Sequence, residues 1–134
     1  GADHVINYRE NEKWGDAVIE LTGGRGVEHI VEVGGPNTLG QSFHCARTGA
    51  HIAIIGAVGG FETDAMPFII MQAKRLNLQA VTVGTRRDQM EMVRAIETHG
   101  VKPVIDSHFP LEKLADAFRH LQSGGHVGKI CIDI

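Results

Sequence analysis

The chain alternates short apolar runs with segments in which apolar residues return every three or four positions. The second pattern is typical of helices that bury one face. It occurs at Trp14, Ala17, Val18 and Leu21; at Leu39, Phe43 and Ala46; at Ile69, Ile70, Ala73 and Leu76; at Met90, Val93 and Ile96; and at Leu111, Leu114, Phe118 and Leu121. The pattern therefore predicts five helices.

Predicted strands lie between these helices. They cover residues 4–8, 29–33, part of 49–60, 79–84, 102–109 and 128–134. The run Ile52–Ile55 is apolar throughout, which indicates a strand buried on both faces, as in a parallel sheet. Strands that alternate with helices of about ten residues predict an α/β fold with a doubly wound parallel sheet.

Composition limits the classes of function. Net charge is −3, so the chain offers no electrostatic reason to bind nucleic acid or an anionic membrane. No apolar run reaches the length of a membrane span, and no signal peptide is visible. Cys45 and Cys131 lie far apart and are expected to be buried hydrophobic residues. We expect a cytoplasmic protein with a small-molecule substrate.

One turn raises the question of a phosphate site. In "VEHIVEVGGPNTLGQS" a strand ends in glycines before a helix, a common place to hold phosphate. The segment Gly35–Ser42 resembles a phosphate loop, but Gln41 replaces the lysine that reaches the phosphates. A methyltransferase would need glycines where Pro36 and Thr38 stand. A plain helix start capped by Asn37 or Thr38 explains much of the stretch.

Three predicted strands end in glycine: "VEVGG", "IIGAVGG" and "VTVGT". In a doubly wound sheet the carboxyl ends of the strands form one crevice, where ligands bind. Glycine has no side chain, so a ring or ribose can lie against its backbone. The three ends together predict a ligand crevice.

Four segments also resemble a known family. They are "GADHVINYRE", "LTGGRGVEHIVEVGG", "GAHIAIIG" and "VIDSHFPLEKLADAFRHLQSGGHVGKICI", and they cover essentially the whole chain. Together they resemble the medium-chain dehydrogenase/reductase family, which comprises zinc-type alcohol dehydrogenases and quinone oxidoreductases. The closing segment is the most specific, with Pro110, Phe118, Leu121, Ser123-Gly124 and Gly128-Lys129 in that order and spacing.

The resemblance places the chain in the C-terminal part of such an enzyme. Residues 1–100 would be the distal part of the dinucleotide-binding domain, and residues 101–134 would return to the catalytic domain. The fold would be Rossmann-like and incomplete, lacking the first two strands and the glycine-rich loop. Accordingly, G-x-G-x-x-G occurs nowhere in the sequence. The nearest match, Gly24-Arg25-Gly26, lies at a predicted helix end and not between a strand and a helix, where the motif is required.

The resemblance also implies which residues lie beside NAD or NADP. They are Val33, Gly34 and Gly35 after one strand; Gly56, Ala57 and Val58 after the next; and Val83, Gly84 and Thr85, whose backbone would hold the nicotinamide carboxamide. Tyr8 would lie near the adenine ribose and Lys129 near the pyrophosphate. Without the resemblance, Tyr8 is an ordinary strand-end aromatic, Lys129 a surface lysine, and the valines are core residues.

Metal binding is not indicated in this chain. Its eight histidines show no H-x-x-x-H pair and no cysteine at ligand spacing. In the family the zinc ligands and the substrate pocket lie upstream of the segment seen here. The resemblance therefore allows zinc in the parent enzyme, with no ligand from this chain.

These observations predict the function of the parent protein. The resemblance implies an NAD(P)-dependent oxidoreductase that transfers hydride between nicotinamide and a small alcohol, aldehyde, ketone or quinone. This chain would supply the nicotinamide-side wall, with no catalytic acid or base, and would be inactive alone. The alternatives are a non-catalytic nucleotide-binding or scaffolding module of the same fold and a methyltransferase.

Loss of the first two strands would expose the edge of a normally central strand. Exposed apolar edges pair with other chains. We therefore expect the chain to form a homo-oligomer, and sedimentation velocity over a range of concentrations measures this directly. A monomer at high concentration would contradict the expectation.

Overall fold

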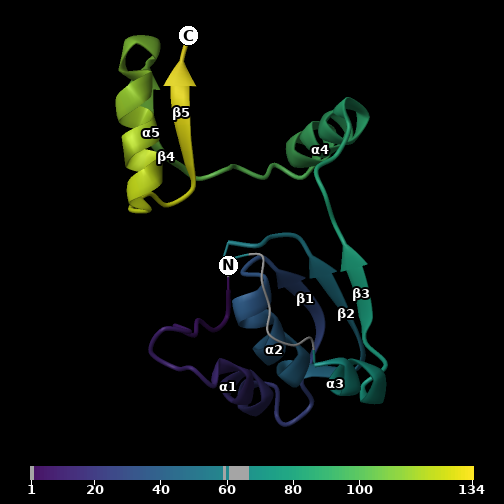
Figure 1. The fold of residues 1–134 in the computed structure, drawn as a ribbon. Coiled ribbons are helices and arrows are strands. Elements are labelled where there is room, and N and C mark those ends of the chain that lie inside the picture. Colours follow the sequence, from purple (N-terminus) through teal and green to yellow (C-terminus); the bar gives the residue numbers. More distant parts are fainter. Residues whose placement is uncertain (1, 59, 61–66) are drawn as a thin grey trace. The chain divides into compact units, whose positions relative to one another are not determined.

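The structure is a computed structural model that describes residues 2–58, 60 and 67–134. The chain separates into two compact units, Gly1–Val83 and Gly84–Ile134 (Figure 1). Each unit is built around parallel strand pairs, so the predicted α/β class with parallel strands is confirmed. The division into domains at residue 100 stays a prediction.

The first unit is a three-stranded parallel sheet with helices in its connections. Its elements are α1 (Trp14–Leu21), β1 (Val27–Glu32), α2 (Pro36–Cys45), β2 (Ala46–Ile54), α3 (Phe68–Ala73) and β3 (Asn77–Ala80). The strand order is β1-β2-β3, and His51 of β2 pairs with His29 of β1 and with Asn77 of β3. Each chain segment between paired strands contains a helix, as parallel connections require.

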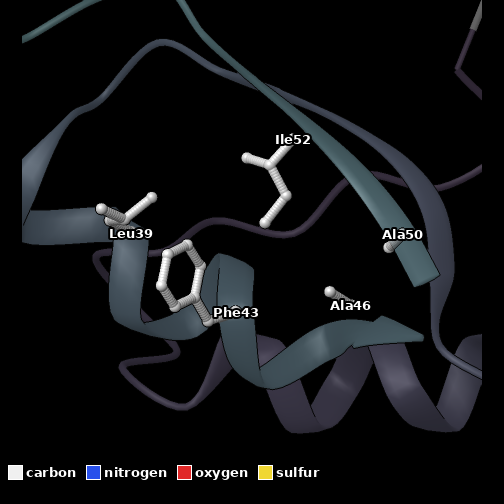
Figure 2. Packing of buried hydrophobic residues seen from close by; sticks show 5 residues of the cluster. All are labelled: Leu39, Phe43, Ala46, Ala50 and Ile52. Carbon is white, nitrogen blue, oxygen red and sulfur yellow. The ribbon is translucent and has the colours of Figure 1, made fainter. Parts of the chain in front are cut away.

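The core of this unit lies between α2 and β2 (Figure 2). Leu39 and Phe43 are four residues apart on α2 and pack with Ile52 of β2, and Phe43 and Ile52 are fully buried. Complete burial of one such side chain contributes about 1.5–3 kcal/mol. Ala46, expected on the α2 stripe, is the first residue of β2 and still belongs to this core.

The other face of the sheet is open. Burial alternates along β2, with Ala50 and Ile52 buried and His51 exposed between them. On β1 the side chain of Val31 is 68% exposed. The apolar run Ile52–Ile55 predicted a strand buried on both faces. In the described chain the helices cover only one face of these strands, so the other face is more exposed than predicted.

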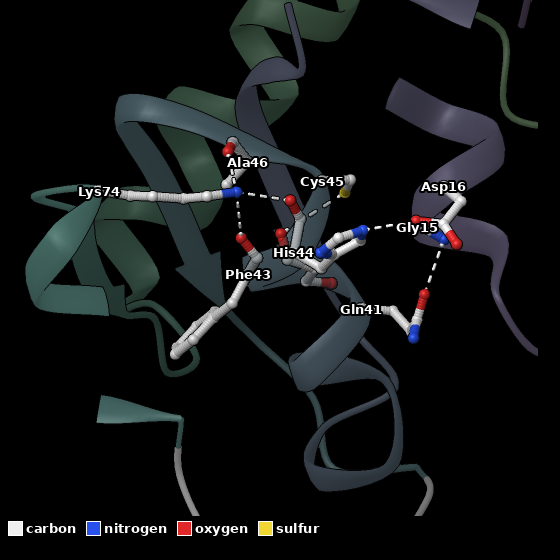
Figure 3. A network of polar contacts seen from close by, with 9 residues as sticks. Gly15, Asp16, Gln41, Phe43, His44, Cys45, Ala46 and Lys74 are labelled. Carbon is white, nitrogen blue, oxygen red and sulfur yellow. Dashed lines mark hydrogen bonds and ion pairs between the residues drawn. The ribbon is translucent and has the colours of Figure 1, made fainter. Parts of the chain in front are cut away.

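Lys74 holds the C-terminal end of α2 (Figure 3). Its ammonium group donates hydrogen bonds to the backbone carbonyls of Phe43 at 3.2 Å, His44 at 2.5 Å and Ala46 at 2.8 Å. The last carbonyls of a helix lack intrahelical donors and carry partial negative charge, so a cation is favourable there. Lys74 directly follows α3, and its side chain therefore fastens α3 to α2.

Two polar contacts join α1 to α2 in the same view (Figure 3). The Gln41 side-chain oxygen accepts a hydrogen bond from the backbone N–H of Gly15 at 2.9 Å. The His44 ring lies 2.6 Å from a carboxylate oxygen of Asp16. A Cβ on Gly15 would lie 2.7 Å from the Gln41 oxygen, so glycine permits the close approach of the two helices.

The second unit contains α4 (Arg86–Thr98), β4 (Ile105–Pro110), a 3₁₀ turn η1 (Leu111–Lys113), α5 (Leu114–Ser123) and β5 (Lys129–Asp133). Strands β4 and β5 are parallel, and α5 connects them and packs on both. Ala117 of α5 is its one buried residue among those described. Gly124, in the left-handed conformation, ends α5 as the "SGG" sequence predicts.

Three further sequence expectations about the elements were wrong. Residues 4–8 are not a strand, because in the described chain no strand pairs with them. The third helix ends at Ala73 and does not reach Leu76, because Arg75 takes a φ of 50°, outside the helical range. The next strand consequently begins early, and β3 covers 77–80 in place of 79–84.

Asp106 links three parts of the second unit. Its carboxylate lies 2.8 Å from the His120 ring on α5 and accepts a hydrogen bond of 3.0 Å from the Val127 N–H before β5. The hydrogen bonds to His120 and then to Val127 lower the pKa of Asp106 from 3.8 to about 2. Asp106 itself lies on β4, so one side chain connects the strand, the helix and the following turn.

We predict that replacing Lys74 by methionine destabilises the first unit. The substitution keeps the aliphatic stem and leaves three carbonyl oxygens without their shared donor. Hydrogen bonds to charged groups contribute about 1.5–3 kcal/mol, so the free energy of unfolding should fall by about that amount. Urea denaturation measures the change, and Lys13→Met, at an exposed lysine, is the matched control. Equal stability of the two variants would contradict the prediction.

We predict an acid-sensitive contribution from Asp106. A carboxylate whose pKa is lower in the folded state adds stability above its unfolded pKa and loses it as pH falls through the folded value. The stability difference between the chain and Asp106→Asn should therefore be full at pH 5 and shrink between pH 4 and about 2. Denaturation curves across this range measure it, with Glu112→Gln as the exposed control. A difference that does not change with pH would exclude the ionised carboxylate of Asp106 as its source.

Candidate functional site

A cleft of about 650 Å³ opens at the carboxyl end of β1. Tyr8 and Arg9 line it from the N-terminal segment, Val33 and Gly34 from the turn after β1, and Val58 from the segment after β2. Its volume is in the range of small-molecule sites. The position agrees with the rule that ligands of open α/β sheets bind beyond the carboxyl ends of the strands.

The structure brings together seven of the residues expected beside the cofactor. Tyr8, Val33, Gly34 and Val58 line the cleft itself. The remaining three, Gly35, Gly56 and Ala57, lie at the same strand ends: the N–H of Gly56 donates to the carbonyl of Glu32 at 3.3 Å, and a Cβ on Gly35 would lie 2.8 Å from the Cα of Ala57. Their contact with a cofactor stays a prediction.

Two of these glycines are required by the protein's own packing. A Cβ on Gly56 would collide with the carbonyl oxygen of Val33. Gly35 has a φ of 83°, a conformation that favours glycine, and its Cβ position is filled by the backbone of Ala57. Gly35 and Gly56 therefore let the turns after β1 and β2 approach each other. The glycines in the sequence were interpreted as room for a ligand, and the pattern alone could not distinguish that role from this close packing of the two turns.

Glu32 is the central polar group of the site, and sequence reasoning missed it. Its side chain is buried at 4% exposure, and one carboxylate oxygen accepts hydrogen bonds from the N–H groups of Gly34 at 2.9 Å and Gly35 at 3.0 Å. The same oxygen accepts a 2.6 Å bond from the Thr38 hydroxyl, and the other oxygen accepts one from the Ser42 hydroxyl. The carboxylate thus occupies the N-terminal end of α2, where the helix dipole favours negative charge.

This arrangement corrects the expected helix start. The residue before α2 is Gly35 and makes no side-chain cap bond, whereas Asn37 and Thr38, the expected caps, lie inside the helix. The signal that could have identified Glu32 is the spacing of an acid, two glycines and then two hydroxyl residues one helical turn apart. On a helix, residues four apart share a face, so Thr38 and Ser42 both reach the carboxylate.

The remaining expected cofactor contacts have other roles in the structure. Thr85 is the N-cap residue of α4 and forms a capping box: its N–H and hydroxyl donate to the Asp88 carboxylate at 2.6 and 2.7 Å. Its carbonyl accepts the N–H of Gln89 at 3.0 Å. The hydrogen bonds from the Thr85 hydroxyl and then its N–H lower the pKa of Asp88. The N–H and the carbonyl of Thr85 are thus both engaged at the helix start, and the contact of the backbone at 83–85 with a carboxamide stays a prediction.

The neighbours of Thr85 and the distant Lys129 complete the expected set. Gly84 lies where a Cβ would come within 2.8 Å of the Asp88 Cβ, so the helix start itself requires glycine there. The side chain of Val83 is 97% exposed in the first unit. Lys129 is the exposed first residue of β5 in the second unit, and its N–H donates to the carbonyl of Val104 at 2.9 Å.

The described residues contain no group of three or more His, Cys, Asp or Glu side chains that could hold a metal ion. Both cysteines are free; Cys45 is buried, and burial raises the pKa of its thiol. Among the described helices, none combines the length and apolar character needed to cross a membrane.

Comparison with known proteins decides the family. The sequence profile described as zinc-binding dehydrogenase matches residues 1–132. The chain belongs to the zinc-binding dehydrogenase family. The predicted membership of the medium-chain zinc-type dehydrogenases and quinone oxidoreductases is thereby confirmed.

Similar proteins agree with this assignment. A zinc-type alcohol dehydrogenase-like protein of Schizosaccharomyces pombe is 34% identical over 100% of this chain and 40% of its own length. A quinone oxidoreductase of Pongo abelii is 28% identical over 98% of this chain and 41% of its own length. The crystal structure of an NAD-dependent alcohol dehydrogenase superposes with a TM-score of 0.86 at 28% identity, covering 100% of this chain and 38% of that one. The chain thus spans about 40% of the length of these curated relatives.

Proposed function

We propose that this chain is part of an NAD(P)-dependent oxidoreductase and forms one wall of its dinucleotide site. The observation that carries the proposal is the cleft at the carboxyl end of β1, in a chain that the family profile covers almost completely. The names of its relatives support an alcohol, aldehyde, ketone or quinone as substrate. The nicotinamide would supply the hydride chemistry, and the protein would bind and orient it.

The residues of the cleft fit the ribose portion of a dinucleotide. Tyr8 contributes an aromatic ring and Val58 a branched aliphatic side chain to the cleft, and Gly34 contributes backbone without a side chain. A Cβ on Gly34 would collide with the Thr38 side chain, so the packing of the turn on α2 favours glycine at this point. These residues would position the cofactor, and we assign none of them a role as acid or base.

Arg9 is a cleft residue that sequence reasoning also missed. Its side chain lines the cleft, and no described residue pairs with its guanidinium group. Arginine binds phosphate through paired N–H donors, which favours a cofactor that carries a phosphate near this point. The proposal therefore includes Arg9 as the group that distinguishes NADP from NAD.

Binding measurements on the chain test both statements. We expect NADH or NADPH to bind in titrations followed by nicotinamide fluorescence. Arg9→Ala should weaken NADPH about tenfold, because a charge-assisted bond of about 1.5 kcal/mol is lost, and should change NADH little. Arg25→Ala, at an exposed arginine of the same unit, is the matched control.

The outcomes separate the two statements. A folded chain that binds neither nucleotide would contradict the proposed dinucleotide site. Equal weakening of NADH and NADPH in Arg9→Ala would leave the site in place and remove Arg9 as the discriminating residue.

A further inference from the structure

Four hydrogen-bond donors converge at the start of α2. Two are backbone N–H groups, from Gly34 and Gly35, and two are hydroxyls, from Thr38 and Ser42. Backbone N–H groups of a glycine turn at the start of a helix are the donors with which many proteins bind phosphate. Here all four donors bind the carboxylate of Glu32, which is the last residue of β1. These four donors form a group that could bind an anion, here called the anion cradle. In this chain the Glu32 side chain occupies it.

We propose that Glu32 is a specificity-determining residue that closes the start of α2 to phosphate groups. Its fixed negative charge would direct an uncharged part of the dinucleotide, the ribose, to the turn at Gly34. The statement that the ligand is a dinucleotide rests on the proposed function. The exclusion of phosphate by Glu32 does not rest on it.

The position of Glu32 supports an effect on ligands in the cleft. Glu32 itself lines the cleft, beside Gly34 and Thr38. Like charges at close range repel each other more strongly where the surroundings exclude water. The other charged or titratable residues that line the cleft are His4, Tyr8 and Arg9, all on the N-terminal segment. The helix side of the cleft is therefore the side that rejects anions.

A purely structural role makes a different prediction. If Glu32 only fixed the turn, its removal would destabilise the chain and create no affinity for anything. If it occupies an anion cradle, its removal should leave four donors that an external anion can use. Gain of binding is therefore the readout that separates the two roles.

The first experiment uses Glu32→Ala in the 134-residue chain. Thermal unfolding and calorimetric titration with inorganic phosphate are compared with sodium chloride at equal ionic strength. We expect the unaltered chain to bind phosphate only weakly, through Arg9, and the variant to bind it at least about tenfold more tightly, with saturable stabilisation. Adding Ser42→Ala should reduce the gained affinity. A folded Glu32→Ala that binds phosphate no better than the unaltered chain would overturn the proposal.

A second variant covers the case in which Glu32→Ala does not fold. Glu32→Ser removes the charge, vacates most of the space that the carboxylate occupies and leaves a hydroxyl that can accept one of the hydrogen bonds of the turn. It should bind inorganic pyrophosphate at least about threefold tighter than the unaltered chain at matched ionic strength. Unchanged pyrophosphate affinity would overturn the proposal.

These tests are independent of the dinucleotide. If phosphate binding is not gained while NADH or NADPH still binds, this inference fails and the proposed function stands. If phosphate binding is gained while neither nucleotide binds the unaltered chain, the proposed function fails and the exclusion of phosphate by Glu32 stands.

Discussion

The hydrogen bonds of Glu32 fix the place where β1 becomes α2, and much of the first unit follows from this one carboxylate. It is buried, so leaving its charge without partners would be strongly unfavourable, and the four donors supply them. The turn that satisfies them requires Gly35 at a φ of 83°. Once this turn is set, α2 lies with Phe43 against Ile52, and the core can close.

The same constraint shapes the cleft. Because the Gly34 and Gly35 N–H groups point at Glu32, the turn presents little polar backbone of its own to a ligand. The approach of the turn after β2, which Gly56 permits, then forms the neighbouring wall. The site is therefore a by-product of how two parallel strands end side by side, a common origin of ligand sites in this class of fold.

The sequence predicted those features that depend on local periodicity. The stripe of Trp14, Ala17, Val18 and Leu21 became α1 with the expected bounds, and the stripe of Met90, Val93 and Ile96 lies within α4. Features that depend on partners distant in the chain could not be read from the pattern. Residues 4–8 have strand composition, but a strand also needs a neighbour.

In the candidate site, too, locally marked features were predicted and features that depend on distant contacts were not. The ends of β1 and β2 were located correctly because glycines follow them, and Tyr8, Val33, Gly34 and Val58 do line one cleft, whereas β3 ends at Ala80, before the glycine that was expected to mark its end. Glu32 was missed, since its role depends on hydroxyls six and ten residues ahead that only a helix brings onto one side. The capping box of Thr85 was also missed, although Asp88 lies only three residues later and accepts hydrogen bonds from its N–H and hydroxyl.

The three carbonyl contacts of Lys74 have a consequence for the order in which the chain folds during synthesis. They join residues about thirty positions apart, so α2 remains without its cationic C-terminal partner until residue 74 has been made. The parallel pairing of β2 with β3 requires still later residues. Because such non-local contacts form slowly, the first unit should acquire its structure late and nearly all at once as it leaves the ribosome.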